Sequence, residues 1–250
     1  MKHPIRIIDT GLKPACWNIA MTAALAELHD SGSIPDTVRF HRYPACVLLG
    51  RSQKAGRAAD LAYCRREGIE IARRVTGGGA VFMGPQMLAW DVVVDRADWG
   101  GNLEAITRRI AESVAAGLSR LDVTARFRAP NDIEIGGRKV SGSSGYVGKR
   151  SAILQGTVLV RDETTMMACA LGLSEPGLRS TITCLAEACG HSPPLPAITA
   201  CVIRGLAESL DRMPNLEAPG GEEVTLCEAL LQGKFGSDVY AAEEAPRHDP

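Results

Sequence analysis

A glycine-rich segment at residues 73–82 contains the residue types best suited to hold a ligand. It reads Arg73-Arg74-Val75-Thr76-Gly77-Gly78-Gly79-Ala80-Val81-Phe82, with strand-like residues before and after the glycines. Three glycines in a row leave bare backbone, so a ligand can lie against main-chain N–H groups while an arginine meets an anion. The segment is neither a Walker loop nor a dinucleotide fingerprint, because no Gly-Lys-Ser/Thr follows and a strand succeeds the glycines. Taken alone, it fits a hairpin turn with two solvated arginines equally well.

A second segment, residues 131–143, carries a lysine in a defined position. Asn131-Asp132 opens a strand, Gly136-Gly137 predicts a tight hairpin, and a second strand follows with Lys139 just past the turn. Only small residues and one valine come after Lys139 in this segment. A fixed ammonium can stabilise negative charge that develops on oxygen. The alternative for Lys139 is an exposed lysine at the end of a hairpin.

The two segments together resemble the catalytic domain of the lipoate–protein ligase A family, within the biotin/lipoate ligase and octanoyltransferase fold. The resemblance runs from about Asp9 to about Tyr240. We expect an α+β fold, with a mixed, largely antiparallel sheet flanked by helices and a smaller sheet beside it. We expect a catalytic domain at 1–213, a linker and short C-terminal segment at 214–240, and a disordered tail at 241–250. The family's C-terminal accessory domain has no counterpart, so either a separate small subunit supplies it or the enzyme works without it.

The resemblance implies ATP-dependent activation of lipoate or octanoate to an acyl-adenylate, with Mg²⁺ on the phosphates. The acyl group then passes to a lysine of a lipoyl-domain or H-protein-like acceptor. Lys139 is the implied catalytic residue, Arg74 would face the phosphate or carboxylate, and the glycines would line an acyl tunnel. Asn131 and Asp132 would bind the nucleotide or its metal, with Asp132 as the Mg²⁺ contact. The implied substrate and ATP contacts are Arg74, Thr76, Gly77, Gly78, Gly79, Ala80, Val81, Phe82, Asn131, Asp132, Lys139, Ser141, Gly142 and Ser143.

Two positions depart from the family pattern. Met83 and Gln155 stand where relatives usually carry histidine. These departures keep open a non-catalytic partner subunit as one alternative function. A second alternative is an ATP-independent octanoyl- or lipoyltransferase of the same fold. The cysteine-dependent transferases place their nucleophile shortly before the lysine strand, whereas no cysteine lies between Cys64 and Cys169 here.

The cysteines and the composition exclude several other classes. The eight cysteines are irregularly spaced without a CxxC pair, so we expect buried thiols, no catalytic cysteine and no structural metal. A net charge of −1 and 4% aromatic residues argue against nucleic-acid binding. No apolar run is long enough to span a membrane and no signal peptide is evident, so we expect a cytoplasmic protein.

The elements that must position these residues follow from the apolar periodicity. Helices are predicted at 14–29, 61–67, 102–121, 164–171 and 199–210. Strands are predicted at 5–9, 38–41, 45–49, 87–94 and 151–160, and on both sides of the glycine-rich segment. The segment 50–53 follows a strand and is expected to border the substrate site.

Overall fold

The computed structural model describes residues 3–236 and is built on an eight-stranded sheet in the order β11-β1-β2-β6-β10-β9-β8-β7. The strands β11, β1 and β2 run parallel, and the other neighbouring strands are antiparallel. A second sheet has the order β4-β3-β5. The predicted α+β fold, a mixed and largely antiparallel sheet with a smaller sheet beside it, is therefore confirmed.

The strands are β1 (His3–Leu12), β2 (Thr37–Arg42), β3 (Cys46–Leu49), β4 (Glu70–Arg73), β5 (Val81–Met83), β6 (Met87–Asp95), β7 (Ala125–Arg128), β8 (Asp132–Ile135), β9 (Arg138–Val147), β10 (Ser151–Leu159) and β11 (Arg212–Glu217). The helices are α1 (Ala15–Asp30), α2 (Ala55–Ala58), α3 (Leu61–Arg66), α4 (Leu103–Leu118), α5 (Thr164–Leu171), α6 (Glu175–Thr181), α7 (Leu185–Ala188), α8 (Leu195–Ser209) and α9 (Gly221–Leu230). Single helical turns follow α4 at Ser119–Leu121 and α9 at Leu231–Phe235.

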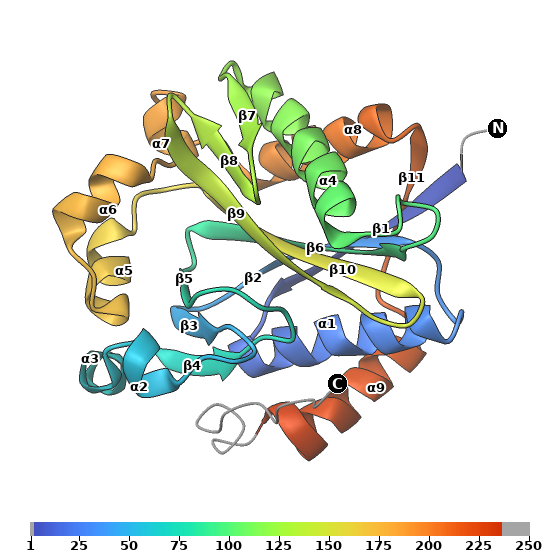
Figure 1. Ribbon diagram of the computed structural model, residues 1–250, viewed down its shortest axis with the longest axis horizontal. Coiled ribbons are helices and arrows are strands. Elements are labelled where there is room, and N and C mark those ends of the chain that lie inside the picture. The colour runs from blue at the N-terminus through green and yellow to red at the C-terminus, as the bar shows by residue number, and fades with distance from the viewer. Residues whose placement is uncertain (1–2, 237–250) are drawn as a thin grey trace.

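Two hydrophobic layers cover the two faces of the large sheet. Figure 1 shows α1 and α9 packed together below the sheet, while α4 and α8 lie above it. One core contains Met21 and Leu25 of α1 with residues of the small sheet. The other contains Trp90 of β6 with Ile110 of α4 and Val202 of α8. The site described below lies on the α1 side, between the two sheets.

The helix predicted at 102–121 forms as the spacing of its apolar residues indicated. Ile106, Ile110, Val114 and Leu118 share one face at helical spacing, and all four are buried. The side chain of Asn102 accepts an N–H from the first turn at 2.8 Å and so caps the helix. The predicted helix is confirmed, with its last residues forming a tighter turn.

The linker predicted from 214 is wrong for the part that the structure describes. Residues 212–217 form β11, which pairs in parallel with β1, and α9 begins at Gly221 and packs against α1. Buried Arg6 of β1 explains the error, because it forms ion pairs with Glu217 at 2.8 Å and with buried Glu223. These acidic residues suggested a solvated linker, yet they neutralise a charge inside the fold.

Two further expectations concern the C-terminal tail and membrane-spanning segments. The tail predicted at 241–250 lies outside the described residues. Between residues 3 and 236, no helix is long and apolar enough to cross a membrane.

Candidate active site

Both arginines of the glycine-rich segment are buried beneath it. Arg73 is 1% exposed and donates to the carbonyls of Gly50 and Gln53, at 3.1 and 2.6 Å. Arg74 is 5% exposed and donates to the carbonyls of Gly77 and Gly79, both at 2.7 Å. The alternative of a turn with two solvated arginines is therefore wrong. Arg74 therefore supports the glycine-rich segment from inside, while Arg73 supports residues 50–53.

Arg74 is a buried cation that supports the loop. Besides the two glycine carbonyls, its guanidinium donates to the carbonyl of Leu48 at 2.9 Å and to the hydroxyl of Thr76 at 3.1 Å. Burial lowers the pKa of Arg74 to about 10, with Tyr43 opposing part of the shift, so the side chain stays charged at neutral pH. Most of its donors are taken by the chain itself. Its predicted contact with a ligand anion therefore remains a prediction.

Gly50 allows the loop to approach the end of β3. A β-carbon at Gly50 would lie 1.9 Å from the carbonyl oxygen of Gly78, which no real contact permits. Gly78 itself has φ of +93°, a conformation that favours glycine. None of residues 50–53 lines the pocket described below, so the expectation that this segment borders the substrate site stays a prediction.

Lys139 lies at the start of β9, immediately after the predicted hairpin. Gly136 and Gly137 have φ of +59° and +76°, as a tight turn of this kind requires. The Lys139 ammonium lies 2.7 Å from Asp132 Oδ1, in an ion pair whose angles are not those of a hydrogen bond. A β-carbon at Gly142 would lie 2.5 Å from that ammonium, so a larger residue there would force the end of the Lys139 side chain to shift. The small residues after Lys139 thus have a steric role.

Asp132 is largely buried and already carries two cationic partners. Its Oδ1 faces Lys139, and its Oδ2 accepts from Arg128 at 2.9 Å. No group of three acidic, histidine or cysteine residues within 3–236 could hold a metal ion. The geometry therefore does not fit a magnesium site built by the protein at Asp132. A metal contact there stays a prediction that this arrangement does not favour.

A chain of hydrogen bonds between buried polar side chains connects the large sheet to the glycine-rich segment. Arg39 and Asp91 form an ion pair at 2.9 Å, and both are at most 1% exposed. Gln155 Nε2 donates to Asp91 at 3.2 Å, and Gln155 Oε1 accepts from Thr76 at 2.9 Å. Thr76 also bonds Ser144 at 2.9 Å. The uncharged amide of Gln155 therefore connects the Arg39–Asp91 ion pair in the sheet to Thr76 of the glycine-rich segment.

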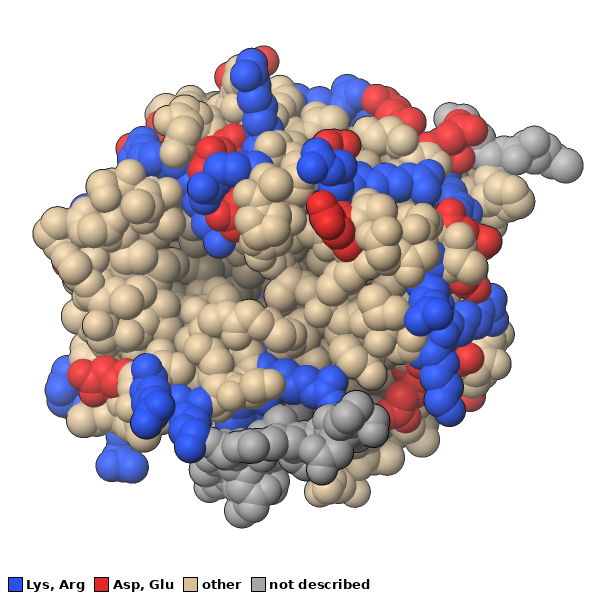
Figure 2. Space-filling view, viewed as in Figure 1, with Lys and Arg blue, Asp and Glu red and all other residues tan. Residues whose placement is uncertain are grey.

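These parts surround a pocket of about 250 Å³ between the two sheets. Figure 2 shows this face of the molecule hollowed below β9, with mostly uncharged side chains around the hollow. Of the predicted contacts, the pocket is lined by Arg74, Gly78, Gly79, Ala80, Val81, Asn131, Lys139, Gly142 and Ser143. The predicted contacts that do not line it are Thr76, Gly77, Phe82, Asp132 and Ser141. Thr76 and Asp132 instead hold lining residues in place, and Phe82 belongs to the core.

The sequence analysis named Met83 and Gln155 only as departures from the family pattern, and it missed the residues that β2 and β6 contribute. The pocket is also lined by His41, Tyr43, Leu48, Met83, Ala89, Asp91, Ser144, Gln155, Gly156 and Thr157. A signal was present in the sequence, because Asp91 interrupts an otherwise apolar strand and His41 alternates with core residues in β2. A polar side chain in a buried strand requires a partner or a ligand.

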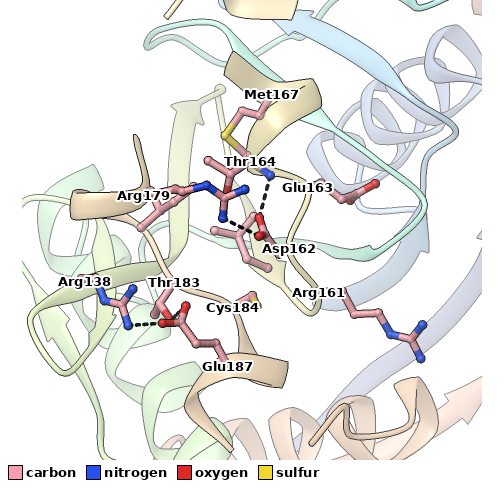
Figure 3. A pocket seen from close by; sticks show the side chains of 12 residues that line it. Arg138, Arg161, Asp162, Glu163, Thr164, Met167, Arg179, Thr183, Cys184 and Glu187 are labelled. Carbon is pink, nitrogen blue, oxygen red and sulfur yellow. Dashed lines mark hydrogen bonds and ion pairs between the residues drawn. The ribbon is translucent and has the colours of Figure 1, made fainter. Parts of the chain in front are cut away.

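A second pocket of about 260 Å³ lies beyond Lys139, among α5, α6 and α7. Figure 3 shows two ion pairs across it, Arg138 with Glu187 and Arg179 with Asp162, each at 2.6 Å. Cys184 lies in this pocket, and burial raises the pKa of its thiol. Among the described residues no histidine lines this pocket, so no imidazole is available there to activate the thiol.

Comparison with known proteins places this geometry in a family. An octanoyltransferase LipM of Symbiobacterium thermophilum is 27% identical over 94% of this chain and 97% of its own length. The lipoate–protein ligase A subunit 1 of Thermoplasma acidophilum is 30% identical, over 58% of each chain.

Solved structures show the same fold. A chain of the bipartite lipoate protein ligase from T. acidophilum, described with its E2 lipoyl domain, gives a TM-score of 0.87 at 22% identity and covers 100% of this chain and 99% of that one. A lipoate–protein ligase A bound with ATP gives 0.84 at 23% identity, over 97% of this chain and 99% of that one. The model of the lipoyl protein ligase A/B catalytic domain matches residues 14–207, and the chain belongs to that family.

Proposed function

We propose that this protein is a lipoate–protein ligase that activates lipoate or octanoate with ATP and transfers the acyl group to a lysine of a lipoyl-domain or H-protein-like acceptor. The observation that carries the proposal is the position of Lys139. Its side chain is 38% exposed at the pocket, and Gly142 leaves space around the ammonium. A cation in that place can meet both the acyl carboxylate and an incoming phosphate.

In the proposed chemistry the positive charge of Lys139 acts in two successive steps. The acid's carboxylate oxygen attacks the α-phosphorus of ATP, so that an acyl-adenylate forms and pyrophosphate leaves. The acceptor lysine then attacks the acyl carbonyl, and AMP leaves with the bonding electron pair. Negative charge grows on phosphoryl oxygen in the first step and on carbonyl oxygen in the second, and Lys139 would stabilise both. Mg²⁺ would enter with the ATP phosphates, which suit it better than a protein cage.

Asn131 and Ser143 would hold the two strands around this charge. The Asn131 amide donates to the Ser143 carbonyl, and the Ser143 hydroxyl donates to the Asn131 carbonyl at 3.1 Å. This reciprocal pair joins the residue before β8 to the middle of β9, on either side of Lys139. Asn131 would therefore act first as a positioning residue for the lysine strand.

The transferase alternative is favoured by the name of the LipM relative, while the pocket itself offers that chemistry little support. No cysteine of residues 3–236 lines the pocket that contains Lys139. Cys184 lies in the other pocket, with its pKa raised by burial. A transferase that forms a thioester needs an accessible thiolate near the acyl carbonyl.

We propose a lipoyl-domain acceptor and a separate accessory subunit as partners. Two similarities support this: one relative is called a ligase subunit 1, and one solved structure is described as bipartite and includes an E2 lipoyl domain. The activation step is where the accessory subunit would act, since the family's C-terminal domain assists that step.

Lipoate-dependent exchange of labelled pyrophosphate into ATP tests the proposal, with the chain alone and with a candidate accessory protein added. Exchange in the wild type that is lost in Lys139→Ala supports the ligase. Octanoyl transfer from an acyl carrier protein to the acceptor without ATP, in place of exchange, would establish the transferase. Absence of both reactions, together with stimulation of another enzyme, would establish a partner subunit.

A further inference from the structure

One row of residues crosses the floor of the pocket, which is the face of the large sheet turned toward the glycine-rich segment. His41 of β2 pairs with Ala89 of β6, and Ala89 pairs with Thr157 of β10. Paired residues of antiparallel strands project from the same face of a sheet, and all three residues line the pocket. Thr157 is the residue that β10 contributes to this row.

The side chain of Thr157 faces the pocket, because its neighbours in β10 fix the orientation of that strand. A β-carbon at Gly156 would lie 2.0 Å from the Trp90 ring, and Trp90 belongs to the core on the α4 side. Gln155 faces the opposite side, where its amide oxygen accepts from Thr76 of the glycine-rich segment. Successive residues of a strand alternate between the two faces, so Thr157 shares the face of Gln155.

The same face brings Thr157 close to the Lys139 ammonium. In the register of β9 with β10, Ser143 lies opposite Gly156. The next position in that register places Gly142 opposite Thr157, and both line the pocket. A β-carbon at Gly142 would lie 2.5 Å from the Lys139 ammonium. Directly opposed β-carbons are about 5 Å apart, so an oxygen atom between Thr157 and Lys139 is within reach of both.

The hydroxyl of Thr157 is available to a ligand. Thr157 is half-buried, and its hydroxyl makes no hydrogen bond within residues 3–236. In the same pocket, Ser144 already bonds Thr76 at 2.9 Å, and Arg74 donates to the glycine carbonyls. The strand itself needs no hydroxyl at this position, since valine suits a strand equally well. Thr157 can therefore donate to a bound molecule without breaking a bond within the protein.

Lys139 alone is an incomplete partner for an oxygen on which negative charge develops. Its ammonium lies 2.7 Å from Asp132 Oδ1, so part of its charge is already offset by that carboxylate. Developing charge on a carbonyl oxygen is stabilised by several preorganised donors acting together. The hydroxyl of Thr157 supplies an uncharged donor from the strand next to that of Lys139.

We propose that Thr157 donates a hydrogen bond to the acyl oxygen that also meets Lys139, so that the two side chains form a two-donor site. This inference rests on the proposed function, because it assumes an acyl group bound at Lys139. In the transfer step the acceptor amine forms a bond to the acyl carbon, and the carbonyl electron pair moves onto oxygen. When that pair returns, AMP leaves with the electrons of the C–O bond, and the amine releases its proton to water. Thr157 keeps its own proton throughout.

Single-turnover transfer from preformed octanoyl-adenylate to an acceptor domain tests the inference. Thr157→Val keeps the shape of the side chain and removes the donor, so the transfer rate should fall about 10- to 100-fold. Thr157→Ser keeps the hydroxyl and should stay close to the wild-type rate. Thr157→Ala replaces Thr157→Val if circular dichroism shows that valine unfolds the protein.

Thr199→Val is the matched control. It makes the same change at a half-buried threonine of α8, which lies on the other side of the sheet from the pocket. The transfer rate of this variant should equal that of the wild type. Equal losses in Thr199→Val and Thr157→Val would overturn the inference.

Infrared spectroscopy of bound octanoyl-adenylate, isotope-labelled at the carbonyl carbon, gives a readout that a purely structural role would not change. A hydrogen bond to a carbonyl oxygen lowers the stretching frequency of the carbonyl. The band should therefore move to higher frequency in Thr157→Val and stay in place in Thr157→Ser and Thr199→Val.

A wild-type transfer rate with an unshifted carbonyl band in Thr157→Val would overturn the inference, as would a slow Thr157→Ser. Failure of the wild type to bind octanoyl-adenylate would overturn it together with the proposed function. Because the adenylate is supplied, a band shift in Thr157→Val without pyrophosphate exchange by the wild type would support the inference and refute only the ligase assignment. The two claims therefore fail separately.

Discussion

Replacing Lys139 with alanine removes the ammonium that lies 2.7 Å from Asp132 Oδ1. The fold should tolerate this change, because Lys139 is 38% exposed and Asp132 keeps its bond from Arg128 at 2.9 Å. Because Lys139 is partly exposed to solvent and Asp132 keeps a second cationic partner, the loss of this ion pair should cost about 1 kcal/mol of the free energy of unfolding. The chemical cost should be much larger. Losing one preorganised charge-stabilising group reduces turnover roughly 10²–10³-fold, or about 2.7–4 kcal/mol of transition-state stabilisation.

The assay is the rate of lipoylation of an acceptor domain at saturating lipoate and ATP, with the Kd of lipoate measured separately. Turnover should fall far more than affinity, because the ammonium acts on charge that develops in the transition state. Lys139→Arg should not restore the rate, since a planar guanidinium cannot place its charge where the compact ammonium lies.

Arg138→Ala is the control for this experiment. Arg138 precedes Lys139 on β9 and lines the other pocket, where it forms an ion pair with Glu187 at 2.6 Å. Its removal deletes a neighbouring positive charge without touching the pocket that contains Lys139. Wild-type turnover in Lys139→Ala, or equal losses in both variants, would refute the role given to Lys139.

Three further predictions concern the loop, a titrating carboxyl and a thiol. In Gly50→Ala the methyl group would meet the Gly78 carbonyl oxygen at 1.9 Å, so the glycine-rich segment must shift. The free energy of unfolding, measured in urea, should fall by about 1–3 kcal/mol, and titration should show weaker lipoate binding. Unchanged binding would contradict a role for this segment in holding the ligand. Burial raises the pKa of Glu163 from 4.5 to about 7, so the folded protein holds a proton that the unfolded chain releases, and the free energy of unfolding falls as pH rises across that window. Glu163→Gln should therefore raise the melting temperature more at pH 8 than at pH 5, and an equal effect at both would disprove the assignment. Cys184→Ala should keep its turnover and lose about 1 kcal/mol of stability, while a folded but inactive variant would favour the thiol transferase.

Local chemistry made part of this protein predictable from its sequence. The hairpin at Gly136-Gly137 follows from the turn that adjacent glycines favour, and the space around Lys139 follows from the small residues after it. The long amphipathic helix follows from its apolar spacing. The family resemblance then predicted the fold and most of the segments that line the pocket. These features depend on residues close together in the chain.

Tertiary structure decided the parts that depend on distant residues. The sequence contains Arg74 but does not show that its side chain is buried and supports the carbonyls of Gly77 and Gly79. Arg6 reaches across the edge of the sheet to Glu223, so an apparently solvated acidic stretch becomes part of the fold.

The pocket floor shows the same limit most clearly. His41, Ala89 and Thr157 lie far apart in the sequence, yet they form one row because β2, β6 and β10 are neighbours in the sheet. A register shift of one residue would turn each of these side chains to the opposite face. No local pattern specifies which strands pair or in what register. The residues that form the floor of the pocket could therefore be identified only from the folded sheet.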